Sequence, residues 1–137
     1  MGGDTVRIAV DTNVLLRDAL HDDPRQTPVA SKTLQSAELV VVPAPVLCEF
    51  VWVMRRLYKR STAEIAHSIR LLMSGDNVEL DRPAIEAGLE MLEAGGDFAD
   101  GVIAYEGRWL GAEEFVSFDK KAVPLLKAQG KRARLLA

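Results

Sequence analysis

Short apolar runs alternate along the chain with longer segments in which apolar residues recur at helical spacing. The short runs are too brief for typical helices, and their Val and Ile residues favour strands: VRIAVD (6–11), LVVVP (39–43), NVEL (77–80), EFVSFD (114–119) and ARLL (133–136). We expect the first run to be a buried strand that ends at Asp11.

The segments between these runs carry helix signals. Val46, Phe50, Val53 and Leu57 recur at intervals of 4, 3 and 4 residues, which predicts an amphipathic helix with these residues in the core. Ser61 with Glu64 forms a capping box, and Pro or Asp opens several other segments. The predicted helices are 23–38, 44–60, 61–72, 82–94, 97–110 and 120–129.

Strands alternating with helices predict an α/β domain with a mainly parallel sheet. The length of 137 residues suits one domain, 1–137. With 48% apolar and 27% charged residues and no apolar run near 20 residues, we expect a cytoplasmic protein without a membrane segment. A net charge of −3 argues against broad electrostatic binding of nucleic acid, but it is compatible with a local basic rim or with carboxylates that hold a cation.

Two aspartates follow predicted strands. Asp11 ends the first strand and Asp119 ends EFVSFD, at the edge where open α/β sheets bind ligands. Each of them could instead cap the helix that follows. Both interpretations stay open for either residue taken alone.

Three further acids lie in helical segments. Glu49 shares a face with Val46 and Val53, where a carboxylate needs a partner or a metal unless its head reaches solvent. In GGDFADGVIA, Asp97 is expected to cap a helix, with Asp100 at the third helical position. Because Ile103 and Ala104 follow Asp100 on one face, we favour Asp100 as the site residue and Asp97 as a cap or supporting residue.

If the four acids converge on one site, their negative charges must be neutralised. These acids are Asp11, Glu49, Asp100 and Asp119. Two like charges about 5 Å apart repel by roughly 3 kcal/mol at an effective dielectric constant of 20. Protons or a divalent cation must offset this repulsion, and oxygen ligands suit Mg²⁺ or Mn²⁺. A carboxylate-held Mg²⁺ with open positions suits phosphodiester hydrolysis.

The order VDTNVLLR, PAPVLCEFVWVM, DFADGVIA and SFDKKA resembles a PIN domain, and more closely the VapC-type toxin ribonucleases. The resemblance extends from Val6 to Leu136. It implies a three-layer α/β/α sandwich with a central parallel sheet. It also implies a Mg²⁺- or Mn²⁺-dependent endoribonuclease acting on structured RNA such as tRNA. Its expected partners are a second copy, as a homodimer, and a cognate antitoxin that covers the acidic site.

The resemblance also assigns residues. Asp11, Glu49, Asp100 and Asp119 match the four acids of the family and would be both catalytic residues and metal ligands. A supporting role through hydrogen bonds is implied for a second group: Thr12, Asn13 and Ser117. Gly101 stands where Ala is more usual, and we expect it to loosen its helix slightly.

Other features remain ambiguous from the sequence. The basic residues Arg55, Arg56, Lys59 and Arg60 could hold RNA phosphates or simply form a solvated helix end. Aromatic residues are expected in the core or at a dimer contact, and not as platforms on which bases stack: Trp52, Tyr58, Tyr105 and Trp109.

Two other functions remain open. The first is an aspartate phosphotransfer domain, for which Lys120 beside Asp119 is suggestive but which leaves Glu49 without a role. The second is a catalytically silent dimeric module whose acidic groove binds a basic peptide. Metal-dependent RNA cleavage would separate the nuclease from both.

Overall fold

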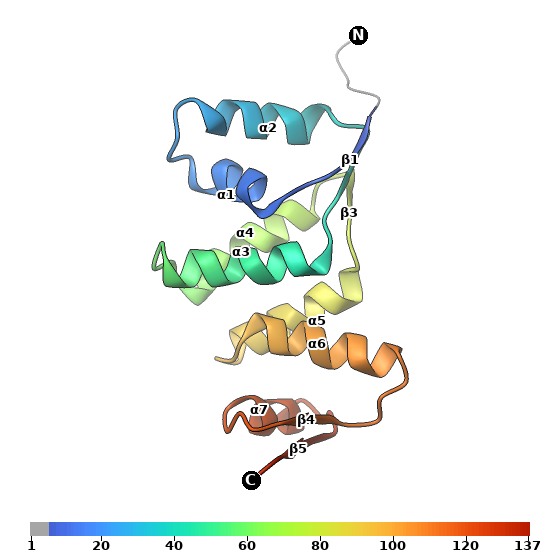
Figure 1. Ribbon diagram of the computed structural model, residues 1–137. Helices are drawn as coiled ribbons and strands as arrows, with labels where there is room; N and C mark the ends of the chain where they lie inside the picture. Colours follow the sequence, from blue (N-terminus) through green and yellow to red (C-terminus); the bar gives the residue numbers. More distant parts are fainter. Residues whose placement is uncertain (1–5) are drawn as a thin grey trace. The chain divides into compact units, whose positions relative to one another are not determined.

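The structure is a computed structural model that describes residues 6–137 as two compact units, unit 1 up to Asp81 and unit 2 from Arg82. The first five residues of the predicted domain lie outside the described part. Each unit contains helices and a small parallel sheet (Figure 1). No helix within residues 6–137 has the length and apolar character needed to cross a membrane.

Unit 1 contains a three-stranded parallel sheet with helices attached to it. Its strands occur in the order β1 (Arg7–Ala9), β2 (Leu39–Val41) and β3 (Val78–Glu79). Its helices are α1 (Thr12–Leu20), α2 (Gln26–Ser36), α3 (Ala44–Arg56) and α4 (Thr62–Met73). Ile8 is in register with Val40, and Val40 with Val78. Since β1 and β2 run parallel, α1 and α3 both begin just past the same edge of the sheet.

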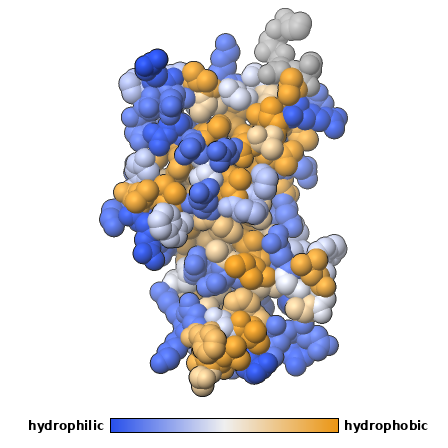
Figure 2. Space-filling model, viewed as in Figure 1, coloured by the Kyte–Doolittle hydropathy of each residue, from blue (hydrophilic) through white to orange (hydrophobic). Residues whose placement is uncertain are grey.

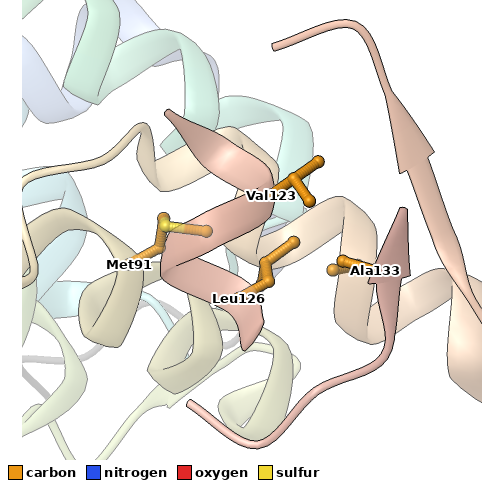
Figure 3. Close-up of a cluster of buried hydrophobic side chains, with 5 residues drawn as sticks. Met91, Val123, Leu126 and Ala133 are labelled. Carbon is orange, nitrogen blue, oxygen red and sulfur yellow. The ribbon is translucent and has the colours of Figure 1, made fainter. Parts of the chain in front are cut away.

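Unit 2 contains two long helices followed by a small parallel sheet. Its elements are α5 (Arg82–Glu93), α6 (Phe98–Trp109), β4 (Phe115–Ser117), α7 (Ala122–Ala128) and β5 (Ala133–Leu135). Helix α7 links β4 to β5 and closes a core cluster built around Met91, Val123, Leu126 and Ala133 (Figure 3). The predicted α/β fold with parallel strands is therefore confirmed.

Several helix ends follow from local sequence. The predicted capping box is present, because Ser61 Oγ accepts the Glu64 N–H while Glu64 accepts the Ser61 N–H. Asp23 Oδ1 accepts the N–H groups of Arg25 and Gln26, so α2 begins at Gln26 and not at Pro24.

The structure differs from the predictions in unit 1. β1 is mostly exposed, because it lies at one end of the described three-stranded sheet, and only Val10 beyond it is buried. Helix α1 was not predicted as an element. Of the predicted α3 stripe, Phe50 is buried, Val46 and Val53 are half-buried and Leu57 is exposed. The buried face is completed by Leu47, Val51 and Met54, each one residue after a predicted position.

Two of the aromatic residues are exposed, which disagrees with the core role that was one of the two predicted for them. Trp52 is 54% exposed and Trp109 is 79% exposed. In Figure 2, apolar and hydrophilic residues are interspersed on the face in view. Neither tryptophan is a core residue, whereas the expected dimer contact stays a prediction.

Gly101 has a packing role that its helix propensity does not reveal. A Cβ atom at this position would lie 2.4 Å from the carbonyl oxygen of Ala87 and 2.9 Å from the Cα of Gly88. The glycine therefore permits α6 to approach α5 closely, a packing role that comes in addition to the expected slight loosening of its helix.

Candidate active site

Asp11 and Glu49 are joined through Thr12 in unit 1. Asp11 caps α1, and its Oδ1 accepts the Thr12 N–H at 2.7 Å. The Thr12 side chain is 3% exposed, and its hydroxyl donates to Glu49 Oε1 at 2.5 Å. One buried threonine thus contacts two exposed carboxylates, Asp11 just after β1 and Glu49 in α3, the helix that follows β2.

The capping role of Asp11 is compatible with a ligand role. The cap uses Oδ1, and the bond from Thr12 uses Oε1 of Glu49, so the second oxygen of each carboxylate can take a different partner. Among residues 6–137, no basic side chain forms an ion pair with either acid. Asp11 can therefore cap α1 and bind a ligand at the same time.

Glu49 lies on the solvent face of α3 and not beside the core. Pro45, Glu49, Trp52 and Arg56 follow one another at intervals of 4, 3 and 4 residues, and all four are exposed. The carboxylate is held by Thr12 and not by burial. The free-energy cost predicted for a Glu49 carboxylate beside apolar residues therefore does not apply.

Asp97, Asp100 and Asp119 belong to unit 2. Asp97 caps α6, with Oδ1 accepting the Ala99 N–H at 3.1 Å, as predicted. Asp100 is half-buried in the first turn of the same helix. Asp119 lies beyond β4, where its Oδ1 accepts the N–H groups of Lys121 and Ala122, and its own N–H donates to Ser117 Oγ.

The charges of these three acids influence one another. Burial raises the pKa of Asp100, and the negative charges of Asp97 and Asp119 raise it further. Hydrogen bonds from the backbone N–H groups of Ala122 and Lys121 lower the pKa of Asp119. Asp119 is therefore the stable anion of the group, whereas Asp100 is the acid whose charge is least well compensated.

Replacing Asp100 by Asn is expected to stabilise the protein in EDTA, because it removes repulsion and the burial of a charge. Burial of Asp100 and the negative charges of Asp97 and Asp119 all raise its pKa, so its ionised form is disfavoured in the folded protein. We expect the melting temperature at pH 7 to rise by about 1–3 °C. Since the folded-state pKa is raised, the advantage of Asn is complete above that pKa and disappears as the pH falls below the ordinary value of 3.8.

The control for this prediction is Glu113→Gln, which removes an exposed charge in unit 2 away from the three acids. Thermal unfolding in EDTA at pH 7 and near pH 4 measures both variants. An Asp100→Asn variant that melts at or below the wild-type temperature at pH 7 would contradict the electrostatic argument.

The donor chemistry suits a hard divalent cation. Carboxylate oxygens are the preferred ligands of Mg²⁺ and Mn²⁺, and His and Cys are absent from both acidic groups. Within the described chain, no three His, Cys, Asp or Glu side chains form a ready-made cage for a metal ion. Within unit 1 the structure brings Asp11 to Glu49, and within unit 2 it brings Asp100 close to Asp97 and Asp119.

A cleft of about 750 Å³ lies between α1 and α2 in unit 1 and begins at Asn13. Arg17 and Arg25 line it further along. Arg17 donates to Asp22 and to the Tyr58 hydroxyl, which tethers α1 to the end of α3. Arg17 was not predicted as a site residue, because the sequence pattern did not predict α1, the helix that places Arg17 four residues after Asn13.

Sequence reasoning also passed over the exposed face of α3. The spacing of Pro45, Glu49, Trp52 and Arg56 is the same as that of the apolar stripe one residue later. Hydrophobic periodicity normally marks the core, so the sequence favours the apolar stripe as the buried face of this helix.

Comparison with known proteins yields one family and no curated relative. No curated protein matches the chain. The PIN domain family matches residues 8–124, a segment that begins in β1 and ends within α7 and includes all four predicted acids. The parallel α/β fold is consistent with the α/β/α sandwich of that family. The chain belongs to the PIN domain family.

Proposed function

We propose that this chain is a metal-dependent endoribonuclease of the VapC type, the toxin of a toxin–antitoxin pair. PIN domains are generally nucleases that use divalent metal ions, and the family suggests an RNA substrate. The observation that carries the proposal is the pair of carboxylates bonded to Thr12, Asp11 just after β1 and Glu49 in α3, the helix that follows the neighbouring parallel strand β2. This arrangement gives a fixed, solvent-accessible anionic site where α/β folds bind ligands.

In this proposal Asp11, Glu49, Asp100 and Asp119 together hold Mg²⁺ or Mn²⁺. When bound, the cation supplies Lewis-acid chemistry and charge neutralisation for phosphodiester hydrolysis. Asp11 and Glu49 keep a fixed orientation through Thr12. Asp100, whose raised pKa reflects uncompensated charge, gains most from a cation. Asp119 stays ionised because two backbone N–H groups stabilise its charge.

The role of Thr12 is to position Glu49, and a substitution tests it. Thr12→Val keeps the shape and the backbone N–H but removes the hydroxyl bonded to Glu49. We expect a stability change within about 1 kcal/mol, because Glu49 is exposed and regains water. The Mn²⁺ concentration for half-maximal cleavage should rise by about 10- to 100-fold.

Thr12→Ser restores the hydroxyl and serves as the matched control, with metal dependence close to that of the wild type. A metal titration of cleavage rates for both variants gives the measurement. An unchanged metal dependence in Thr12→Val would show that Glu49 does not need this bond.

Cleavage of RNA by the purified protein tests the proposed activity. We expect endonucleolytic products from a tRNA pool in Mn²⁺ or Mg²⁺ and none in EDTA. Incorporation of phosphate without cleavage would favour the phosphotransfer alternative, and the absence of both reactions would favour the silent binding module.

The proposed partners are tested separately from the chemistry. Expression of the chain alone should arrest bacterial growth, and co-expression of a cognate antitoxin should restore it. Sedimentation at equilibrium should give a homodimer. Growth unaffected by an active nuclease would leave the enzyme in place and contradict the toxin role.

A further inference from the structure

The exposed face of α3 extends from Glu49 toward a group of cations. Trp52 lies about 4.5 Å and Arg56 about 10.5 Å along the helix axis from Glu49. Lys59 follows just beyond the end of the helix. We call Trp52, Arg56 and Lys59 the α3 track.

The side chains of the α3 track are available to a ligand. Trp52 presents its indole to solvent with 54% of the residue exposed, and Arg56 and Lys59 are also exposed. None of the three makes a hydrogen bond or ion pair with another residue in the described chain. The neighbouring cations differ in this respect, since Arg55 donates to Thr62 and Arg60 pairs with Glu64.

Lys59 lies where the chain leaves α3. Its φ of 55° is the left-handed conformation in which helices commonly end, and the Arg60 N–H donates to the Met54 carbonyl oxygen at the same place. This helix ending adds a second free cation three residues after Arg56.

We propose that the α3 track binds single-stranded RNA beside the cleavage site, with Trp52 stacking on a base and Arg56 and Lys59 contacting phosphates. This inference rests on the proposed nuclease function, because it starts from Glu49. Exposed aromatic residues interspersed with unpaired cations are the chemistry that binds single strands without strict sequence preference. Protein partners are less favoured, since the two free cations follow Trp52 four and seven residues later along the chain and match a polyanion.

Fluorescence of Trp52 tests the proposal directly. The chain contains two tryptophans, so Trp109→Phe leaves Trp52 as the only indole, and Trp52→Phe leaves only Trp109. Each variant is titrated in EDTA, which prevents cleavage, with a single-stranded RNA of about ten nucleotides. We expect RNA to quench Trp52 in the first variant and to leave Trp109 unchanged in the second.

Affinity measurements separate the contribution of base stacking on Trp52 from that of the cations Arg56 and Lys59. With a fluorescein-labelled RNA of the same sequence, Trp52→Ala should bind about tenfold more weakly. Arg56→Gln should reduce the slope of log K against log salt by about 0.7, the value for one phosphate contact on a single strand. Arg60→Gln, which removes a cation already paired with Glu64, is the matched control and should change the slope less.

Failure of the α3 track and failure of the nuclease proposal give different results. RNA cleavage in Mn²⁺ without quenching of Trp52 would overturn the track and leave the nuclease in place. Quenching in EDTA together with no cleavage in any metal would support the track and contradict the nuclease. A Trp52 signal that changes with protein concentration and not with RNA would overturn the proposal in favour of contact between two copies of the chain.

Discussion

Replacing Asp11 by Asn is expected to abolish metal-dependent RNA cleavage while leaving the fold intact. Asn is as good a helix cap as Asp, so the oxygen that accepts the Thr12 N–H remains. The substitution removes the negative charge that the proposed cation requires. Since loss of metal-assisted charge stabilisation is worth several kcal/mol, we expect the cleavage rate to fall about 100-fold or more.

Asp23→Asn is the matched control for this prediction. Asp23 is also an aspartate just before a helix of unit 1, and its Oδ1 accepts the N–H groups of Arg25 and Gln26. Its variant should keep near wild-type cleavage and a similar melting temperature. Rates in Mn²⁺, with circular dichroism of all three proteins, give the comparison. Wild-type cleavage by Asp11→Asn would remove Asp11 from the active site.

Replacing Gly101 by Ala is expected to destabilise the protein strongly, although Ala is the better helix former. The new Cβ would lie 2.4 Å from the Ala87 carbonyl oxygen and 2.9 Å from the Met91 Cβ. Backbone atoms of α5 cannot yield as a flexible side chain can, so α5 and α6 must separate. We expect a net loss of about 1–3 kcal/mol, after a gain in helix propensity of up to about 1 kcal/mol.

Gly107→Ala is the matched control, because Gly107 lies in the same helix and its nearest neighbour would be 3.9 Å from an added Cβ. We expect that variant to gain about 0.5–1 kcal/mol. Urea unfolding of both variants measures the difference. A Gly101→Ala protein as stable as Gly107→Ala would show that the contact between α5 and α6 is not tight.

Gly101→Ala also connects stability with the proposed activity. Asp100 precedes Gly101 in α6, so separation of α5 from α6 would displace its carboxylate. A shift of about 1 Å in an active-site group can reduce a rate by about 100-fold. We therefore expect this variant to lose cleavage even at temperatures where it remains folded.

Local sequence was sufficient to predict features that depend on neighbouring residues. The capping box of Ser61 and Glu64 and the Asp97 cap were correctly predicted, because each involves atoms only a few residues apart. The parallel strands followed from the alternation of short apolar runs with helices. The order of the acidic motifs likewise indicated the PIN family, which the match over residues 8–124 shows.

Features that depend on packing between distant elements were decided by the tertiary structure. Periodicity places Glu49 on α3 but does not identify which side of the helix faces the core, so the predicted stripe is only partly buried and the exposure of Trp52 was missed. The sequence likewise treated Gly101 as a matter of helix propensity, since the backbone of α5 that requires it lies more than ten residues away.

The sequence by itself determined which acids the chain carries, that Asp97 begins a helix, and the family to which the chain belongs. Only the tertiary structure decided that Thr12 joins Asp11 to Glu49, because that hydrogen bond spans 37 residues and exists only when β1 and β2 pair. Hydrogen bonds and charges act over a few ångströms in space. A sequence reveals them when the partners are close along the chain, and folding establishes them when they are not.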